Sequence, residues 1–163
     1  MGTPLRIAGR AVALTAALAL PAMALAAVER LDDSASPRAQ VAADLRAARS
    51  PDGRSQTVSF GRVEYRLATA RFVGRNARIH HVIPIFPGLQ SPAGVRLEWR
   101  GSGRFAHGSG RPGDRVLVWA GVVREPWIDE ALELSLTLGP DAVRLPAGTA
   151  LRLETYFEIE AFR

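Results

Sequence analysis

Alternation of apolar and polar residues at a period of two is the feature that most limits how this chain can fold. The clearest runs are Val63–Leu67, Ile79–Ile85, Val95–Arg100, Leu132–Leu138 and Leu151–Glu160, and Thr57–Phe60 is a shorter one. An extended strand points successive side chains to opposite faces, so each run can place one face on a core and the other in water. A helix would spread the same apolar side chains around its axis, and the pattern therefore indicates β-strands.

Turn-forming residues separate these runs, at Pro87-Gly88, Pro112-Gly113-Asp114 and Gly139-Pro140-Asp141 among other places. The segment Val116–Val123 is apolar on both faces, which predicts a central strand. Seven or eight short strands with regular breaks predict an all-β fold. We expect an antiparallel β-sandwich over residues 56–163, immunoglobulin-like or jelly-roll-like, with a barrel as the second choice.

The first 26 residues have the pattern of an export signal. Arg6 and Arg10 precede an apolar run from Ala11 to Leu20, and small residues end the segment at Ala26. The apolar run before Pro21 is too short to span a bilayer, which takes about 20 residues. We therefore expect residues 1–26 to be removed and the protein to be exported, to the periplasm or the cell exterior.

Residues 27–55 differ from the rest, since they contain no aromatic residue. Ser36-Pro37 is a plausible helix start, with Ser as the N-cap and Pro at the first helical position. Val41, Leu45 and Ala48 then fall on one helical face. This stripe is thin, so we expect either a marginal helix or a flexible tether in an N-terminal arm.

Composition excludes several classes of site. The chain has no Cys, so disulfides, a lipid anchor on Cys, a thiolate nucleophile and Cys-ligated zinc are all absent.

Charge is divided along the chain. Residues 38–115 hold 14 Arg and five acids, whereas residues 116–163 hold four Arg and eight acids. Pairing of opposite charges across neighbouring strands is the favoured explanation, ahead of a functional basic face.

A glycine-rich segment is the most individual motif, since Gly101-Ser102-Gly103-Arg104 recurs as Gly108-Ser109-Gly110-Arg111. Backbone N–H groups in such turns can bind an anion, and Arg can hold a phosphate or carboxylate with two hydrogen bonds. A flexible connection between two strands is the simpler explanation. The candidate ligand-binding residues are Arg104, Arg111, Gly103, Gly110 and, from a nearby loop, Trp127.

His80, His81 and His107 are the only histidines. Neighbours in a strand point to opposite faces, so His80 and His81 cannot both bind one ion from an ordinary strand. We predict no metal site and no cofactor, and keep the three histidines as weak metal candidates.

No catalytic constellation stands out, and we predict that the protein is not an enzyme. Ser102 and Ser109 lack the rigid support that a nucleophile needs. Asp129, Glu130 and Glu133 lie beside Trp127, as in the lining of a sugar site. A glycan hydrolase therefore remains as the third hypothesis.

The last strand resembles the C-terminal strand of chaperone–usher pilus subunits from Gly148 onward. An alternating strand follows this glycine, and Phe162 lies near its end. The chain departs from that family in having no Cys and no alternating donor strand in residues 27–50, so the family is not assigned. The resemblance implies strand addition at a sheet edge.

The sequence thus favours an exported, non-catalytic β-sandwich that acts by binding an anionic ligand or an envelope component. The alternative is a structural or assembly subunit of a surface structure, with a protein partner at an edge strand. An anionic small molecule or polysaccharide is the expected ligand, and nucleic acid is not expected.

Overall fold

The computed structural model describes residues 27–37, 41–43, 54–146 and 149–162. The predicted export signal at 1–26 lies outside these ranges. The strands are β1 (Val28–Arg30), β2 (Val41–Ala43), β3 (Gln56–Ala68), β4 (Asn76–Val82), β5 (Val95–Gly101), β6 (Gly108–Gly110), β7 (Arg115–Val122), β8 (Trp127–Leu138), β9 (Leu151–Leu153) and β10 (Tyr156–Phe162). Two short 3-10 turns, Ala70–Phe72 and Pro92–Gly94, complete the described elements. Within the described ranges no helix is long and apolar enough to cross a membrane.

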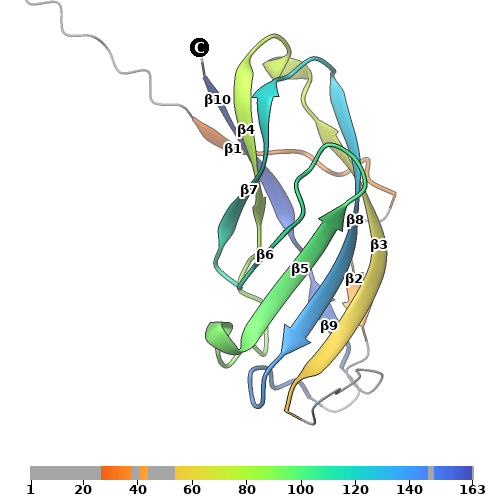
Figure 1. The fold of residues 1–163 in the computed structure, drawn as a ribbon, viewed down its shortest axis with the longest axis vertical. Helices are drawn as coiled ribbons and strands as arrows, with labels where there is room; N and C mark the ends of the chain where they lie inside the picture. The colour runs from red at the N-terminus through yellow and green to blue at the C-terminus, as the bar shows by residue number, and fades with distance from the viewer. Residues whose placement is uncertain (1–26, 38–40, 44–53, 147–148, 163) are drawn as a thin grey trace, which may run out of the picture.

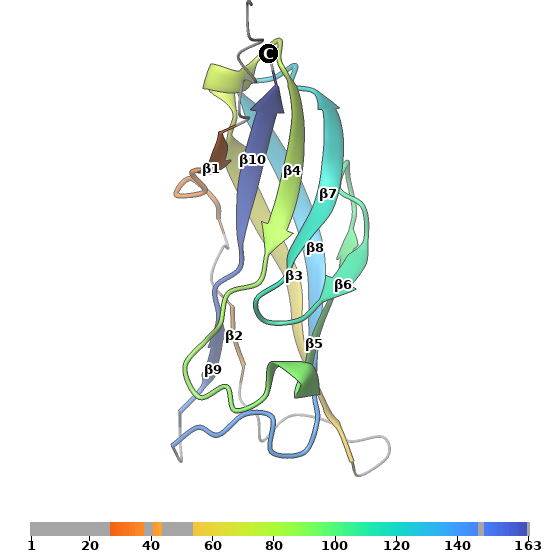
Figure 2. The ribbon, with the colours of Figure 1, turned by 90° about the vertical axis from the view of Figure 1, so that its left-hand side faces the viewer.

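Two antiparallel sheets of four strands pack face to face, which confirms the predicted all-β sandwich (Figure 1). One sheet has the strand order β1-β10-β4-β7 and the other β3-β8-β5-β6. A separate pair, β2-β9, lies at the lower end of the sandwich in Figure 2.

Alternation along β8 shows how the core forms. Its inward apolar side chains are buried, and they are Ile128, Leu132, Leu134, Leu136 and Leu138. Across the interior they meet the inner faces of β4 and β10, including Ile79, Phe157 and Ile159. Burial of one apolar face from each sheet is the main stabilising term for such a fold.

A β-bulge joins two predicted runs into the single long strand β3. The register with β8 shifts between Ser59 and Gly61, and Gly61 has a positive φ of 71°. The extra residue, Phe60, is inserted without ending the strand. A period-two pattern breaks at such a point, which is why Thr57–Phe60 and Val63–Leu67 looked like separate strands.

Two crossing segments connect the sheets along their sides. Residues 31–36 join β10 to β3, since Leu31 N–H donates to the Phe157 carbonyl and Ala68 N–H to the Asp32 carbonyl. Residues 102–106 join β8 to β7, since Ser102 N–H donates to Ala131 and Ala106 N–H to Val118.

The described part of the N-terminal arm is extended, unlike the predicted helix. Val41–Ala43 is a strand paired with β9, whereas Leu45 and Ala48 of the predicted stripe lie outside the described residues. Ser36 does not cap a helix. Its hydroxyl accepts a hydrogen bond from Arg66 N–H on β3. This contact satisfies an edge amide of β3, so tertiary pairing outweighs a weak helical propensity.

The position of Val116–Val123 corrects a second expectation, because β7 lies at the edge of its sheet and not at the centre. Val118 is buried, whereas Leu117 and Val122 are 47% and 43% exposed.

The C-terminal alternating run also differs from the prediction, since it breaks at Glu154-Thr155 into β9 and β10. Strand β10 lies inside its sheet, between β1 and β4, and is not an open edge.

Candidate binding groove on the outer face of β5 and β6

The first half of the glycine-rich segment binds a carboxylate of the protein itself, the side chain of Glu130. Glu130 is 5% exposed, and its Oε2 accepts hydrogen bonds from the backbone N–H of Arg104 at 2.6 Å and of Phe105 at 3.0 Å. Oε1 accepts the N–H of Ala131 at 3.1 Å. The anion-binding turn that the glycines indicate is therefore filled by a buried carboxylate, which fixes the crossing segment.

Gly103 is required by this arrangement. A Cβ atom added there would lie 2.7 Å from Oε1 and 2.8 Å from Oε2 of Glu130. The glycine thus lets the backbone approach the carboxylate closely, and it serves the loop's own stability.

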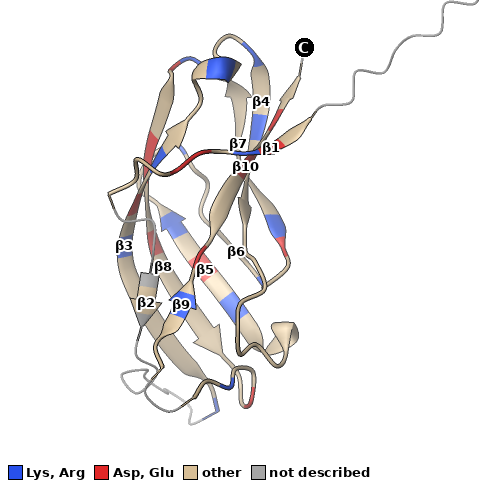
Figure 3. Ribbon diagram, turned by 180° about the vertical axis from the view of Figure 1, so that it is seen from behind, with Lys and Arg blue, Asp and Glu red and all other residues tan. Residues whose placement is uncertain are grey.

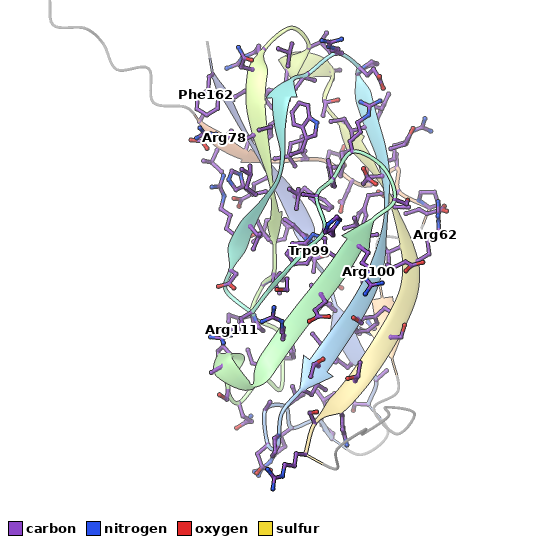
Figure 4. All side chains as sticks on the ribbon, viewed as in Figure 1. Arg62, Arg78, Trp99, Arg100, Arg111 and Phe162 are labelled. Carbon is purple, nitrogen blue, oxygen red and sulfur yellow. The ribbon has the colours of Figure 1, made fainter. Side chains whose placement is uncertain are left out.

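The two predicted arginines do not converge. The Arg104 guanidinium forms an ion pair with Glu125 at 2.8 Å. Arg111 lies beyond β6, in a turn where its N–H donates to Asp114 Oδ2 at 2.8 Å. Figure 4 shows Arg111 on the opposite side of β5 from Arg62. Gly110 packs beside Ile83 and leaves no room for a Cβ atom, so it too is a packing residue.

The second half of the segment borders an open groove on the outer face of β5 and β6. The groove encloses about 560 Å³. Its lining residues are Arg96, Glu98, Trp99, Arg100, Gly101, His107, Gly108 and Ser109. Two arginines and a histidine thus face a single acid. We missed this site in the sequence because its cations come from alternate positions of β5, whose pattern indicated only a solvent-facing strand.

Trp99 and Gly108 form the floor of the groove. Trp99 is 1% exposed, and its Nε1 donates to the Ala106 carbonyl at 3.0 Å. A Cβ atom at Gly108 would lie 2.9 Å from the Trp99 ring. The glycine therefore rests directly on the indole and keeps this part of the groove shallow and rigid.

The groove's arginines differ in their partners. Arg96 Nη2 donates to Ser109 Oγ at 2.6 Å and its Nε lies 3.1 Å from Glu98, so this side chain is held in place across β5 and β6. Arg100 lies opposite Glu133 in the register, yet no ion pair within 4 Å forms between them in the described structure. Arg100 is exposed, so its guanidinium has donors that an external anion can reach. Figure 4 labels it near the end of β5.

The histidines are separated by the fold. His81 points into the core and is fully buried, while His80 lies on the outer face of its sheet and His107 lies in the crossing loop. Among the described residues no group of three or more potential ligands could hold a metal ion. Both ring nitrogens of His81 lack a hydrogen-bond partner, and its ring stacks on Phe157 and meets Trp99 edge-on. Burial lowers the pKa of His81 to about 3.

Trp127 begins β8 and is 40% exposed. The Arg66 guanidinium lies over its ring at 5.7 Å, and the same guanidinium pairs with Asp129. Trp127 does not line the groove. It belongs instead to an exposed cluster with Arg66 and Asp129.

The acids proposed for glycan hydrolysis are divided between two faces. Glu130 points inward and binds backbone N–H groups, whereas its neighbour Asp129 points outward and pairs with Arg66. Glu133 lies on the outer face opposite Arg62. A second hollow of about 310 Å³ includes Asp129 and Glu130 in its lining. Glu130 already accepts hydrogen bonds from the backbone N–H groups of Arg104 and Phe105. This geometry gives no poised acid–base pair.

Opposite charges do pair between the basic and acidic parts of the chain. Among the described residues three ion pairs link them, namely Arg66–Asp129, Arg104–Glu125 and Arg115–Glu158. Figure 3 shows residues of both signs spread along the strands. Only Arg66–Asp129 joins neighbouring strands in register, so cross-strand pairing accounts for a part of the charge segregation. In the basic part, Arg75, Arg78, Arg100 and Arg111 form no ion pair within 4 Å in the described structure.

No protein-family model matches the chain, and neither curated proteins nor solved structures include one with significant similarity to it.

Proposed function

We propose that the protein is an exported, non-catalytic binding protein whose β5–β6 groove takes an anionic ligand. The observation that carries this proposal is the exposed guanidinium of Arg100 in a groove that also holds Arg96 and His107. Arg96 is fixed by Ser109 and Glu98, so part of the site is already arranged before a ligand arrives. A carboxylate, sulfate or phosphate group on a small molecule or polysaccharide fits these donors.

Calorimetric titration of the purified protein at low ionic strength tests this proposal. The probes are inorganic phosphate, citrate and an oligogalacturonate, with a neutral maltooligosaccharide as the reference sugar. We expect saturable binding of at least one anionic probe, weakened by added salt because exposed charges are screened.

The variant Arg100→Gln should weaken that binding at least tenfold, since it removes the charged donor. Arg62→Gln is the matched control, because Arg62 lies on the outer face of the same sheet and pairs with Glu64. Absence of saturable binding by all three anions, or an equal loss in both variants, would refute the groove as the site. Loss in Arg104→Gln or Arg111→Gln alone would move the site to the glycine-rich turns.

Export is tested separately by the mass of the protein recovered outside the cytoplasm. A chain that begins at Ala27 supports removal of residues 1–26. Retention of Met1 on the native protein contradicts it.

A further inference from the structure

One row of side chains crosses all four strands on the outer face of the β3-β8-β5-β6 sheet, and each side chain in it carries an oxygen atom. The row reads Ser59-Ser135-Glu98-Ser109 from β3 to β6. Leu136, the next residue on β8, is fully buried, so the row points outward. The last two residues of the row line the groove, and Figure 1 shows β3, β8 and β5 side by side.

Two hydroxyls of this row have no partner. Ser59 is exposed and Ser135 is half-buried, and neither hydroxyl forms a hydrogen bond within the part of the chain that the structure describes. In the next row Thr57 and Thr137 place two more hydroxyls 3.5 Å apart. We call the five hydroxyl-bearing residues of these two rows the hydroxyl strip, and they are Thr57, Ser59, Ser109, Ser135 and Thr137.

Apolar anchors are absent from the hydroxyl strip, which argues against a protein as its occupant. None of the six large apolar residues that are exposed in the described structure lies on it. Protein interfaces depend on apolar and aromatic anchors at their centre. A glycan instead presents hydroxyls, each of which donates and accepts hydrogen bonds and can pair with Ser and Thr.

The charges around the hydroxyl strip favour a ligand with a single acidic group. Arg100 is the groove arginine that forms no ion pair within 4 Å in the described structure. Glu98 lies in the same row as three of the hydroxyls, and Glu133 lies opposite Arg100. A chain with an acid on every sugar would bring its charges beside these two carboxylates and would be repelled.

We infer that the groove takes a glycan in which one acidic sugar is joined to neutral sugars. Arg100 holds the acidic sugar, and the neutral sugars lie across the strands on the hydroxyl strip. The inference rests on the proposed function, since it identifies the class of the groove's anionic ligand. Neighbouring strands are about 4.8 Å apart, so the row from Ser109 to Ser59 spans about 14 Å, enough for a short oligosaccharide.

Stacking of a sugar on an aromatic ring does not contribute to this site. No side chain of the hydroxyl strip is aromatic, and Trp99 is 1% exposed because Gly108 rests on its ring. Hydrogen bonds that replace those of water give only a modest net gain in free energy. We therefore expect a dissociation constant on the order of 0.1–1 mM.

Titration of the ¹⁵N-labelled protein, followed in ¹H–¹⁵N correlation spectra, tests the inference. The probes are 3′-sialyllactose and glucuronosyl-xylotriose, each of which joins one acidic sugar to neutral sugars. Their parts are titrated separately, namely sialic acid, lactose, glucuronic acid and xylotriose. We expect at least one probe to bind about tenfold more tightly than its acidic sugar alone, and its neutral part not to saturate. Trigalacturonate, with three acids, should bind more weakly than that probe.

The double variant Ser59→Ala/Ser135→Ala removes two hydroxyls of the strip. It should weaken binding of the oligosaccharide about fivefold more than binding of its acidic sugar, because two hydrogen bonds to the neutral sugars are lost. Arg100→Gln should weaken binding of both. Ser91→Ala is the control, because Ser91 lies in a turn outside both sheets and its side chain makes no capping hydrogen bond. Far-ultraviolet circular dichroism and a thermal melt of each variant establish that it is folded.

The outcomes separate failure of this inference from failure of the proposed function. If neither these probes nor phosphate nor citrate binds at the groove, both fail. If anions bind at Arg100 but neither probe binds more tightly than its own acidic sugar, the glycan alone is refuted. Tighter binding of trigalacturonate would overturn the single acidic group. An unchanged preference for the oligosaccharide in the double serine variant would overturn the role of the hydroxyl strip.

Discussion

Two buried polar residues, His81 and Glu130, affect the stability of the fold in ways that the sequence pattern does not indicate. His81 occupies a core position between Trp99 and Phe157, at ring-centroid distances of 4.6 Å and 4.8 Å. Its two nitrogens have no partner, so the neutral ring is tolerated and a protonated ring is strongly disfavoured. Since the only cause of its lowered pKa is burial, stability should depend on pH through this residue.

Stability should therefore fall as the pH drops from 7 to 5. The pKa of His81 is about 3 in the folded protein and 6.5 in the unfolded chain. Between these values the unfolded chain binds a proton that the folded protein does not, which lowers the free energy of unfolding by about 2 kcal/mol at pH 5. Well above pH 6.5 both states are neutral and the penalty vanishes.

Urea unfolding at pH 7 and pH 5 measures this effect. His81→Leu should remove most of the difference between the two pH values, with a smaller remainder from His80, whose pKa burial also lowers. Val58→Ala is the control, because it removes buried apolar contacts without changing a titratable group, and it should lower stability equally at the two pH values. An unchanged slope in His81→Leu would show that His81 is not the group that titrates.

Glu130 is the second of these residues, and its carboxylate accepts hydrogen bonds from backbone N–H groups. Glu130→Ala leaves the N–H groups of Arg104 and Phe105 without their acceptor. We expect a loss of about 2–4 kcal/mol in the free energy of unfolding, with faster hydrogen exchange at these two amides. Glu133→Ala, on the outer face, should change stability by less than about 1 kcal/mol. Equal effects of the two substitutions would contradict the anchoring role.

At the scale of elements, side-chain periodicity predicted the long strands and missed the short ones. β5 and β8 carry alternating apolar residues over several positions, so a sheet with one buried face was predictable. β6 is Gly108-Ser109-Gly110, which has no apolar side chain to alternate. β1 and β2 have three residues each, and only their pairing with β10 and β9 makes them strands.

Only part of the candidate site was predictable from the sequence, because the rest depends on which strands pair. Glycines in 101–111 raised the hypothesis of an anion-binding turn for an external ligand. In the structure the backbone N–H groups of Arg104 and Phe105 bind Glu130, whose inward position follows from the register of β8 with β3. The groove combines side chains of β5 with the return of the chain through β6. Such a combination depends on strand order, which local sequence does not specify.

The N-terminal crossing segment provides a prediction at this scale. Leu31 is 1% exposed, and its backbone N–H bonds to Phe157. Leu31→Ala should lower the free energy of unfolding by about 2–4 kcal/mol in urea titrations, because it leaves a cavity in the core. Val28→Ala, at a 51% exposed position, should cost less than about 0.5 kcal/mol. A flexible tether would give no loss for either substitution.

For the whole molecule, the two sheets differ in what their outer faces present. The β3-β8-β5-β6 sheet carries a groove with an exposed Arg100, and the β1-β10-β4-β7 sheet carries the exposed apolar residues Val28, Leu117 and Val122 on its two outer strands. The segments 31–36 and 102–106 connect the sheets on their two sides and limit open strand edges. Binding is therefore expected on the faces of the sandwich, more than by addition of a strand at its edges.

Titration of the ¹⁵N-labelled protein with citrate, followed in ¹H–¹⁵N correlation spectra, tests the central claim most directly. The account predicts saturating shifts at the amides around the groove, at Arg96, Arg100, His107 and Ser109. Shifts centred on Gly103 or Arg111, or changes that never saturate and spread over both sheets, would contradict it.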